Sequence, residues 1–128
     1  MSLLTAASPI SFILTADRAR AKPFYLGALG LPVVAEDPFA VTLGLAGGAV
    51  LRLTDLPGHV AQHHTVLGWA VADIRAAVAE LRGKGITFKI YDGFGQDPDG
   101  IWTPPGDGAQ VAWFADPDGN VLSLTQFG

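Results

Sequence analysis

Cysteine is absent from this chain of 128 residues. Its absence excludes disulfide bonds, thiolate zinc sites and cysteine nucleophiles, and it favours a reducing compartment. No apolar run approaches the ~20 residues of a membrane span, so no membrane segment is predicted. The first residues, Met1-Ser2-Leu3-Leu4, lack the basic start and apolar body of a signal peptide. We therefore expect a cytoplasmic location.

Charge is scarce as well, because Asp, Glu, Lys and Arg make up only 16% of the residues. The eight Lys and Arg residues are scattered along the chain, and the net charge is −4. Binding to nucleic acid depends on cationic contacts with phosphates, so this balance predicts no nucleic-acid partner. Apolar side chains are abundant, at 49% of the residues, which is typical of a compact globular domain.

The chain contains an internal repeat. Residues 10–17 and 66–73 are both β-rich runs that end in Asp, and a helical pattern follows each of them. Three strands are then predicted in each half, at 32–36, 40–46 and 49–54 and at 86–91, 109–115 and 120–126. We therefore predict a single α+β domain over residues 1–128, built from two tandem βαβββ units. These units lie at about residues 9–55 and 64–127.

The first predicted helix runs from Asp17 to about Leu29 and is less regular than the second, which follows Asp73 as its N-cap. Phe24 and Leu29 are expected to point inward. Pro23 lies within this stretch, and proline disturbs a helix interior, so either a late start or a kink is expected there.

A long segment rich in Gly, Pro and Asp separates two of the predicted strands, at residues 92–108. It contains aromatic side chains, including Phe94 and Trp102. Long loops of this kind are either binding loops or packed surface loops, and both interpretations stay open. By contrast, residues 116–120 (Asp-Pro-Asp-Gly-Asn) suit a tight hairpin turn, which is a structural role.

Several motifs in this order resemble the vicinal oxygen chelate superfamily, which includes glyoxalase I, extradiol dioxygenases, fosfomycin-resistance enzymes and bleomycin-binding proteins. The resemblance extends from about Pro9 to Gln126. It implies a curved mixed sheet around a central cavity, and a homodimer. The motifs that carry it are Phe24-Tyr25 followed by Leu29-Gly30-Leu31, Val71-Ala72-Asp73-Ile74, and Phe114-Ala115-Asp116-Pro117-Asp118-Gly119-Asn120 with Leu122 and Leu124.

The resemblance also implies where metal ligands would stand, on the first and last strands of each half. Those positions hold Ile10, Arg52, Val66 and Ser123, and none is a usual ligand of a divalent ion. We therefore predict no cofactor. A divalent metal remains the alternative, because a register slip of two residues would bring His64 to the pocket side.

Strand alternation predicts which side chains line the cavity. The candidate ligand-binding residues on the strands are Phe12, Arg52, Val66, Gly68, Trp113 and Ser123, and Tyr91 and Trp102 are candidates for stacking on a flat ligand. Arg52 must find a partner because a guanidinium stays charged. It either fixes an anionic or carbonyl-bearing ligand, or forms an ion pair or an interface contact within the protein.

These observations favour a glyoxalase- and bleomycin-resistance-like protein without the usual metal ligands, which binds a small apolar or aromatic molecule for sequestration or resistance. Two alternatives remain open. One is a metal-dependent lyase, isomerase or dioxygenase, and the other is a metal-free enzyme that uses the same pocket. No residue is nominated as catalytic, and whether the chain is an enzyme stays open.

Overall fold

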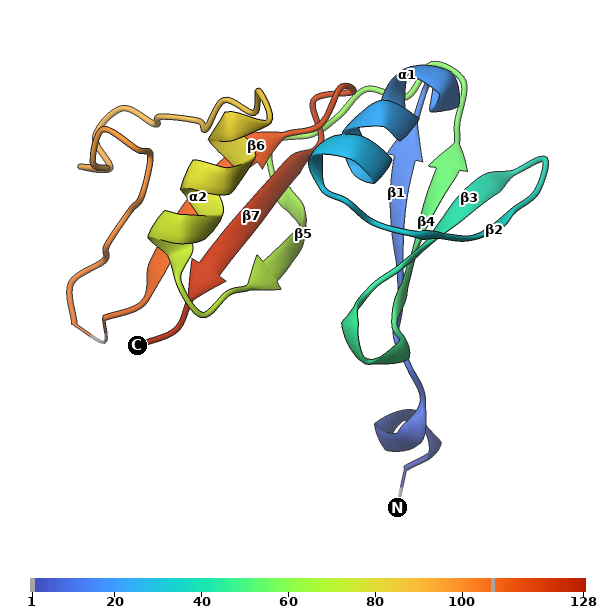
Figure 1. Cartoon of the computed structure of the whole chain (residues 1–128), viewed down its shortest axis with the longest axis horizontal. Coiled ribbons are helices and arrows are strands. Elements are labelled where there is room, and N and C mark those ends of the chain that lie inside the picture. Colours follow the sequence, from blue (N-terminus) through green and yellow to red (C-terminus); the bar gives the residue numbers. More distant parts are fainter. Residues whose placement is uncertain (1, 107) are drawn as a thin grey trace. The chain divides into compact units, whose positions relative to one another are not determined.

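The computed structural model describes residues 2–106 and 108–128. It divides into two compact units, residues 1–60 and residues 61–128, here called the first and the second unit (Figure 1). The division falls between the two predicted repeat units, which lie at about residues 9–55 and 64–127. No helix in the described part of the chain is long and apolar enough to cross a lipid bilayer.

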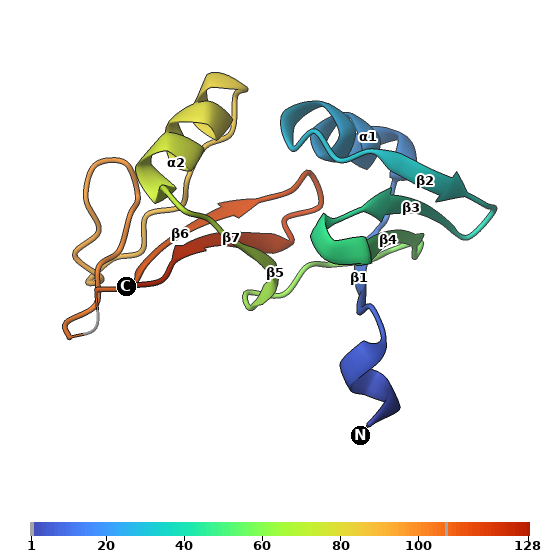
Figure 2. The ribbon, with the colours of Figure 1, turned by 60° about the horizontal axis from the view of Figure 1, so that its bottom comes forward.

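The first unit is a four-stranded mixed sheet in the order β1-β4-β3-β2, with β1 parallel to β4 and the other neighbours antiparallel. Figure 2 shows α1 over one face of this sheet. The elements are the 3₁₀ turn η1 (Leu3–Ala6), strand β1 (Ile10–Thr15), helix α1 (Arg18–Lys22), the π-helical turn η2 (Pro23–Ala28), strands β2 (Val33–Glu36) and β3 (Ala40–Gly44), the turn η3 (Ala46–Gly48) and strand β4 (Val50–Asp55).

The second unit is a three-stranded sheet in the order β5-β7-β6, in which β5 runs parallel and β6 antiparallel to β7. Helix α2 lies over one face of it (Figure 2). The elements are strand β5 (Thr65–Ala70), helix α2 (Ile74–Gly83), strand β6 (Gln110–Ala115) and strand β7 (Val121–Gln126). The α+β fold predicted from the repeat is confirmed, with a mixed sheet and a helix in each half.

The strand predicted over residues 86–91 is wrong in extent. In the described structure only Phe88 pairs there, through an isolated antiparallel bridge with Phe114. The N–H of Lys89 still donates to the carbonyl of Trp113 at 2.8 Å. In a continued strand the next N–H to face β6 would be that of Tyr91, two residues after Lys89. The pairing ends because this N–H donates to the side chain of Gln96 in the following loop instead. The second sheet therefore has one strand fewer than the first.

The first helix starts directly after Asp17, whose carboxylate accepts the N–H of Arg20 at 3.2 Å. A late start at Pro23 is therefore wrong, and the helix changes there from α to π geometry. The N–H of Leu29 donates to the carbonyl of Phe24 at 3.0 Å, five residues back. This wider turn shifts the helical faces. The fully buried side chain is therefore Tyr25, whereas the sequence predicted that Phe24 would point inward.

Buried side chains alternate with more exposed ones along β1, β4 and β6, whereas four consecutive side chains are buried in each of the central strands β3 and β7. Strand alternation predicts eight side chains on the face under the helices. Trp69 and Val71 are only half-buried, and the other six are at most 4% exposed, namely Ile13, Leu51, Leu53, Phe114, Leu122 and Leu124. The register places Phe12 beside Arg52 in the first unit. In the second unit it places Ser123 between Gly68 and Trp113. Sequence alternation is therefore confirmed for the six buried side chains, and it is wrong about the burial of Trp69 and Val71.

Candidate ligand-binding site

Four aromatic side chains of the second unit, Tyr91, Phe94, Trp102 and Trp113, form what we call the aromatic cluster. The ring centroid of Trp113 lies 5.5 Å from that of Tyr91, 5.8 Å from Trp102 and 6.0 Å from Phe94. The ring of Phe94 also lies 5.5 Å from Tyr91 and 5.7 Å from Trp102. These separations are those of favourable edge-on and tilted aromatic contacts.

Strand β6 explains where the cluster forms. Phe114 is fully buried on the face that packs under α2, so its neighbour Trp113 points to the opposite face. The chain returns to the edge of β6 at Trp102, which exchanges backbone hydrogen bonds of 2.8 and 3.0 Å with Val111. Trp102 is thereby held beside Trp113, although eleven positions separate them in the sequence.

Gln96 fixes the chain between Tyr91 and Gly100. Its side-chain oxygen accepts the N–H of Tyr91 at 2.7 Å, and its side-chain nitrogen donates to the carbonyls of Lys89 at 2.9 Å and Gly100 at 2.7 Å. One half-buried amide thus satisfies three backbone groups that no strand pairing takes up. This arrangement holds the loop segment that carries Phe94.

The same loop is tied to helix α2 through Asp97. One oxygen of this carboxylate accepts the N–H groups of Asp99 and Ile101 at 2.9 and 3.0 Å. The other oxygen pairs with Nη2 of Arg75 at 2.7 Å. Partial burial pushes the pKa of Asp97 upward, but Arg75 and the two N–H groups lower it by more, so the net shift in pKa is downward. The loop conformation therefore depends on an ionised carboxylate.

A pocket of about 280 Å³, here called the aromatic pocket, opens beside the aromatic cluster. Its aromatic walls supply flat apolar surface, and its remaining walls supply imidazole rings and a hydroxyl group. Pockets for drug-sized molecules begin at about 300 Å³, so this volume suits a small or flat ligand. The lining residues are His63, His64, Thr65, Tyr91, Phe94 and Trp113.

Six of the eight predicted site residues belong to the second unit, and the structure brings both Tyr91 and Trp102 against the ring of Trp113. Ser123 neighbours Trp113 across β6 and β7. A Cβ atom on Gly68 would overlap the hydroxyl of Ser123, so a larger residue there would require this hydroxyl to move. The remaining residue, Val66, stands at a register irregularity in β5.

Phe12 and Arg52 belong to the first unit, where they are neighbours on the open face of the sheet. Phe12 is 61% exposed. Arg52 has partners within the protein, since it pairs with Asp37 at 3.2 Å and donates to the hydroxyl of Thr42 at 3.2 Å. The N–H groups of Phe39 and Ala40, and then Arg52, lower the pKa of Asp37. Arg52 was predicted either to fix a ligand or to form a contact within the protein, and within this unit it forms the ion pair with Asp37.

The side chains at the family's metal positions do not fit a divalent ion. Ile10 and Val66 have no donor atom, Arg52 is a cation already paired with Asp37, and Ser123 offers only a hydroxyl group. Nowhere in residues 2–106 and 108–128 do three His, Asp or Glu side chains come together as a metal centre would need. His63 and His64 line the aromatic pocket instead.

Sequence reasoning missed Phe94, His63 and Thr65 as lining residues. Phe94 stands in a loop, where no periodicity indicates which way a side chain points. Its presence in a long segment with other aromatic residues was the only available signal. His63 lies just before β5, and Thr65 is its first residue. Both precede the strand predicted from residue 66, so strand alternation was not applied to them.

The chain matches the family model of the Glyoxalase/Bleomycin resistance protein/Dioxygenase superfamily over residues 7–124, and it belongs to this family. The predicted resemblance is therefore confirmed. No curated protein matches the chain.

Solved structures are similar over nearly the full chain, and two of the three described here are named as members of the same family. A member from Sphaerobacter thermophilus is 26% identical with a TM-score of 0.74, covering 97% of this chain and 99% of its own. A glyoxalase/bleomycin resistance protein from Streptomyces sp. CB03234 is 25% identical with a TM-score of 0.65, covering 94% and 100%. TnmS3, an antibiotic binding protein from the same Streptomyces, is 24% identical with a TM-score of 0.69, covering 95% and 96%. At that identity TnmS3 supports the fold alone.

Proposed function

We propose that this protein binds a small apolar or aromatic molecule at the aromatic pocket, as a sequestering or resistance protein does. The observation that carries the proposal is the aromatic cluster, in which Phe94 remains 48% exposed and Tyr91 and Trp113 only half-buried. Burying an exposed aromatic side chain contributes about 1.5–3 kcal/mol. A flat ligand against these rings would recover part of that free energy.

The polar side chains of the pocket narrow the ligand class. His63, His64 and Thr65 lie on one side and offer hydrogen-bond donors and acceptors, whereas the rings offer none except the indole N–H and the phenol. A fused-ring molecule with oxygen or nitrogen substituents along one edge would satisfy both sides. That TnmS3 is named an antibiotic binding protein supports testing natural products of this shape first.

The proposed contacts include residues beyond the pocket walls. Trp102 supports the ring of Trp113, and Gly68, Ser123 and Val66 lie on the neighbouring strands β5 and β7. Phe12 and Arg52, on the open face of the first sheet, remain proposed ligand contacts. We also propose a homodimer, for which light scattering should give twice the chain mass of 13.3 kDa.

Isothermal titration tests the proposal. The probes are bleomycin, which the family name suggests, and planar anthraquinones that carry hydroxyl groups. We expect at least one probe to bind saturably, and Trp113→Ala to weaken it by about tenfold or more, which is the equivalent of 1.4 kcal/mol. The matched control is Trp69→Phe, which changes a tryptophan of the same sheet that does not line the pocket. Equal affinities for both variants would exclude the aromatic pocket as the site.

Metal analysis separates this proposal from a metal-dependent enzyme. We expect the protein, purified without chelators or a histidine tag, to contain no stoichiometric zinc, nickel, manganese or iron. A near-stoichiometric metal that is lost in His63→Ala or His64→Ala would contradict the metal-free part of the proposal. Turnover of a probe without metal would instead favour the metal-free enzyme.

A further inference from the structure

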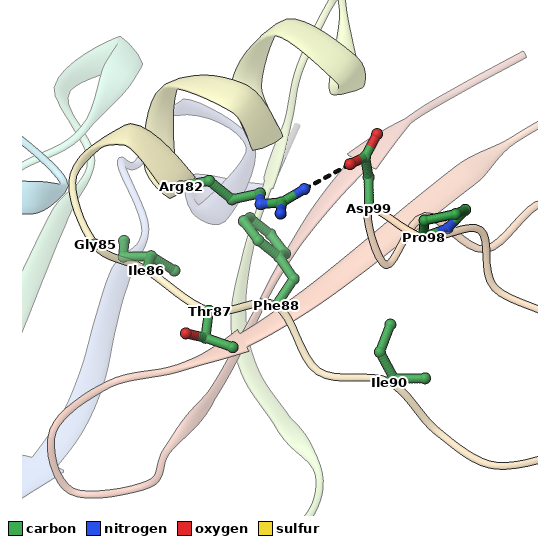
Figure 3. A pocket seen from close by; sticks show the side chains of 8 residues that line it. All are labelled: Arg82, Gly85, Ile86, Thr87, Phe88, Ile90, Pro98 and Asp99. Atoms are coloured by element: carbon green, nitrogen blue, oxygen red, sulfur yellow. Dashed lines mark hydrogen bonds and ion pairs between the residues drawn. The ribbon is translucent and has the colours of Figure 1, made fainter.

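A second pocket lies in the second unit between the end of α2, the segment after it and the loop at residues 98–99. Its volume is about 390 Å³, within the range of small-molecule sites. Figure 3 shows the Arg82 side chain extending from α2 to Asp99, with the ring of Phe88 near it and Ile90 farther along the segment. The lining residues are Arg82, Gly85, Ile86, Thr87, Phe88, Ile90, Pro98 and Asp99.

This pocket is separate from the aromatic pocket. Phe88 pairs with Phe114 through a backbone bridge, and their ring centroids are 5.4 Å apart, so both rings lie on the face toward α2. Trp113, which lines the aromatic pocket, is the neighbour of Phe114 and points to the other face. The sheet therefore lies between the two pockets, and they share no lining residue.

One side of the second pocket is apolar and leads from the core to the surface. Phe88 is 8% exposed and Ile86 is 9% exposed, whereas Ile90 is 60% exposed. Pro98 continues this wall on the loop. An elongated apolar group could therefore be buried against Ile86 and Phe88 with its outer end over Ile90.

The polar side of the pocket is formed by the Arg82 guanidinium, the Asp99 carboxylate and the Thr87 hydroxyl group. Both oxygens of Asp99 are engaged by guanidinium groups, one by Nη1 of Arg82 at 2.5 Å and the other by Nη1 of Arg75 at 3.6 Å. Among the described residues, Nε and Nη2 of Arg82 have no acceptor, although a guanidinium carries several N–H donors. These two N–H donors can be satisfied by an acceptor group of a ligand, and because hydrogen bonds from a guanidinium to an ionised acceptor are the stronger ones, they favour an anion.

We propose that this pocket is a second binding site that takes a small amphipathic anion, with its carboxylate on Arg82 and its apolar chain against Ile86, Phe88 and Ile90. The Arg82–Asp99 pair keeps the guanidinium at the pocket, so the ligand adds to an existing contact and does not have to break it. This site is independent of the ligand proposed for the aromatic pocket.

The probe is octanoate, with octanamide as a neutral control of the same length, followed by amide chemical shifts of the isotope-labelled full chain. We expect the amide shifts of residues 82–90 and 97–100 to change saturably, with a dissociation constant for octanoate in the millimolar range. Octanamide should bind about tenfold more weakly or worse because it lacks the charge-assisted hydrogen bond. Trp113→Ala should leave octanoate binding unchanged, which separates this site from the aromatic pocket.

Two variants test the contacts. Arg82→Gln should weaken octanoate about tenfold and remove its preference over octanamide. If Arg82→Gln disturbs the loop, Ile90→Ser provides the test, because this exposed side chain can be changed without opening the core. We expect Ile90→Ser to weaken octanoate binding. Its matched control is Phe127→Ser, which is 72% exposed and outside the pocket. Shifts centred on Tyr91 and Trp113, equal loss of binding in Ile90→Ser and Phe127→Ser, or a pocket covered by a second copy of the chain would each overturn the proposal.

Discussion

Exchanging Asp116 and Asn120 tests whether the turn between β6 and β7 is a structural device. One oxygen of Asp116 accepts the side-chain N–H of Asn120 at 2.8 Å. The other accepts the backbone N–H groups of Asp118 and Asn120, both at 2.9 Å. Asp116 is 5% and Asn120 3% exposed, so neither side chain has ready access to water as a replacement partner.

The magnitude follows from the single substitutions. Asp116→Asn places two amide groups against each other and leaves a buried N–H without an acceptor, which costs about 2–3 kcal/mol. Asn120→Asp places two carboxylates about 3 Å apart, so either one takes up a proton or the variant loses about 3 kcal/mol or more. The double variant Asp116→Asn with Asn120→Asp restores a donor facing an acceptor. It should be within about 1 kcal/mol of the natural protein, well short of the sum of the two costs.

Urea unfolding of the four proteins measures this coupling, with Asp92→Asn as a control for the same chemical change at an exposed carboxylate. Each kcal/mol corresponds to roughly 2–8 °C in Tm for a domain of this size, so thermal unfolding gives a second readout. If the double variant is destabilised by the sum of the single variants, the turn does not depend on this contact. The reasoning would then be refuted.

Three further predictions concern charge and the loop. Hydrogen bonds from Lys22 lower the pKa of Glu36 below its ordinary 4.5, so its contribution to stability is present above that pH and is lost as the pH falls through the lowered pKa. Lys22→Met should flatten this acid dependence in urea unfolding, and an unchanged pH profile would contradict it. Gln96→Glu replaces a donor by an acceptor against two carbonyls, so it should destabilise the protein by about 2–3 kcal/mol and speed amide exchange at Tyr91. Unchanged exchange there would refute the loop's dependence on Gln96. Finally, Arg52→Ala should weaken binding of an anionic or carbonyl-bearing probe in titration if Arg52 contacts the ligand, and unchanged affinity would remove it from the site.

Local rules were sufficient for much of the fold. Asp73 was identifiable as an N-cap because a carboxylate can accept the N–H three residues onward, and it does so. Asp17 makes the same contact at the start of the first helix, where the sequence had left a late start open. Alternation placed Trp113 and Ser123 on the same face because strand side chains repeat every second residue. These features depend on a few neighbouring residues, so a sequence alone contains the necessary information.

The failures come from side chains that compete with the backbone pattern. The strand predicted over residues 86–91 shortens because the amide of Gln96 takes the groups of Tyr91 and Lys89 that a strand would pair. The π turn after Pro23 displaces the buried face by one residue, to Tyr25. Phe94 was missed as a lining residue because its place in the aromatic cluster depends on this loop conformation. Such effects require three-dimensional contacts that periodicity does not encode.

The central claim is that a small apolar or aromatic molecule binds at the aromatic pocket, against Trp113 and close to Trp102. The most direct test uses the Trp69→Phe protein, in which only these two of the three tryptophans remain to emit fluorescence. A probe that binds by calorimetry should quench or shift this emission saturably, with the same dissociation constant as the calorimetric titration. Calorimetric binding without any change in the emission would mean that the ligand binds elsewhere, and it would contradict the account.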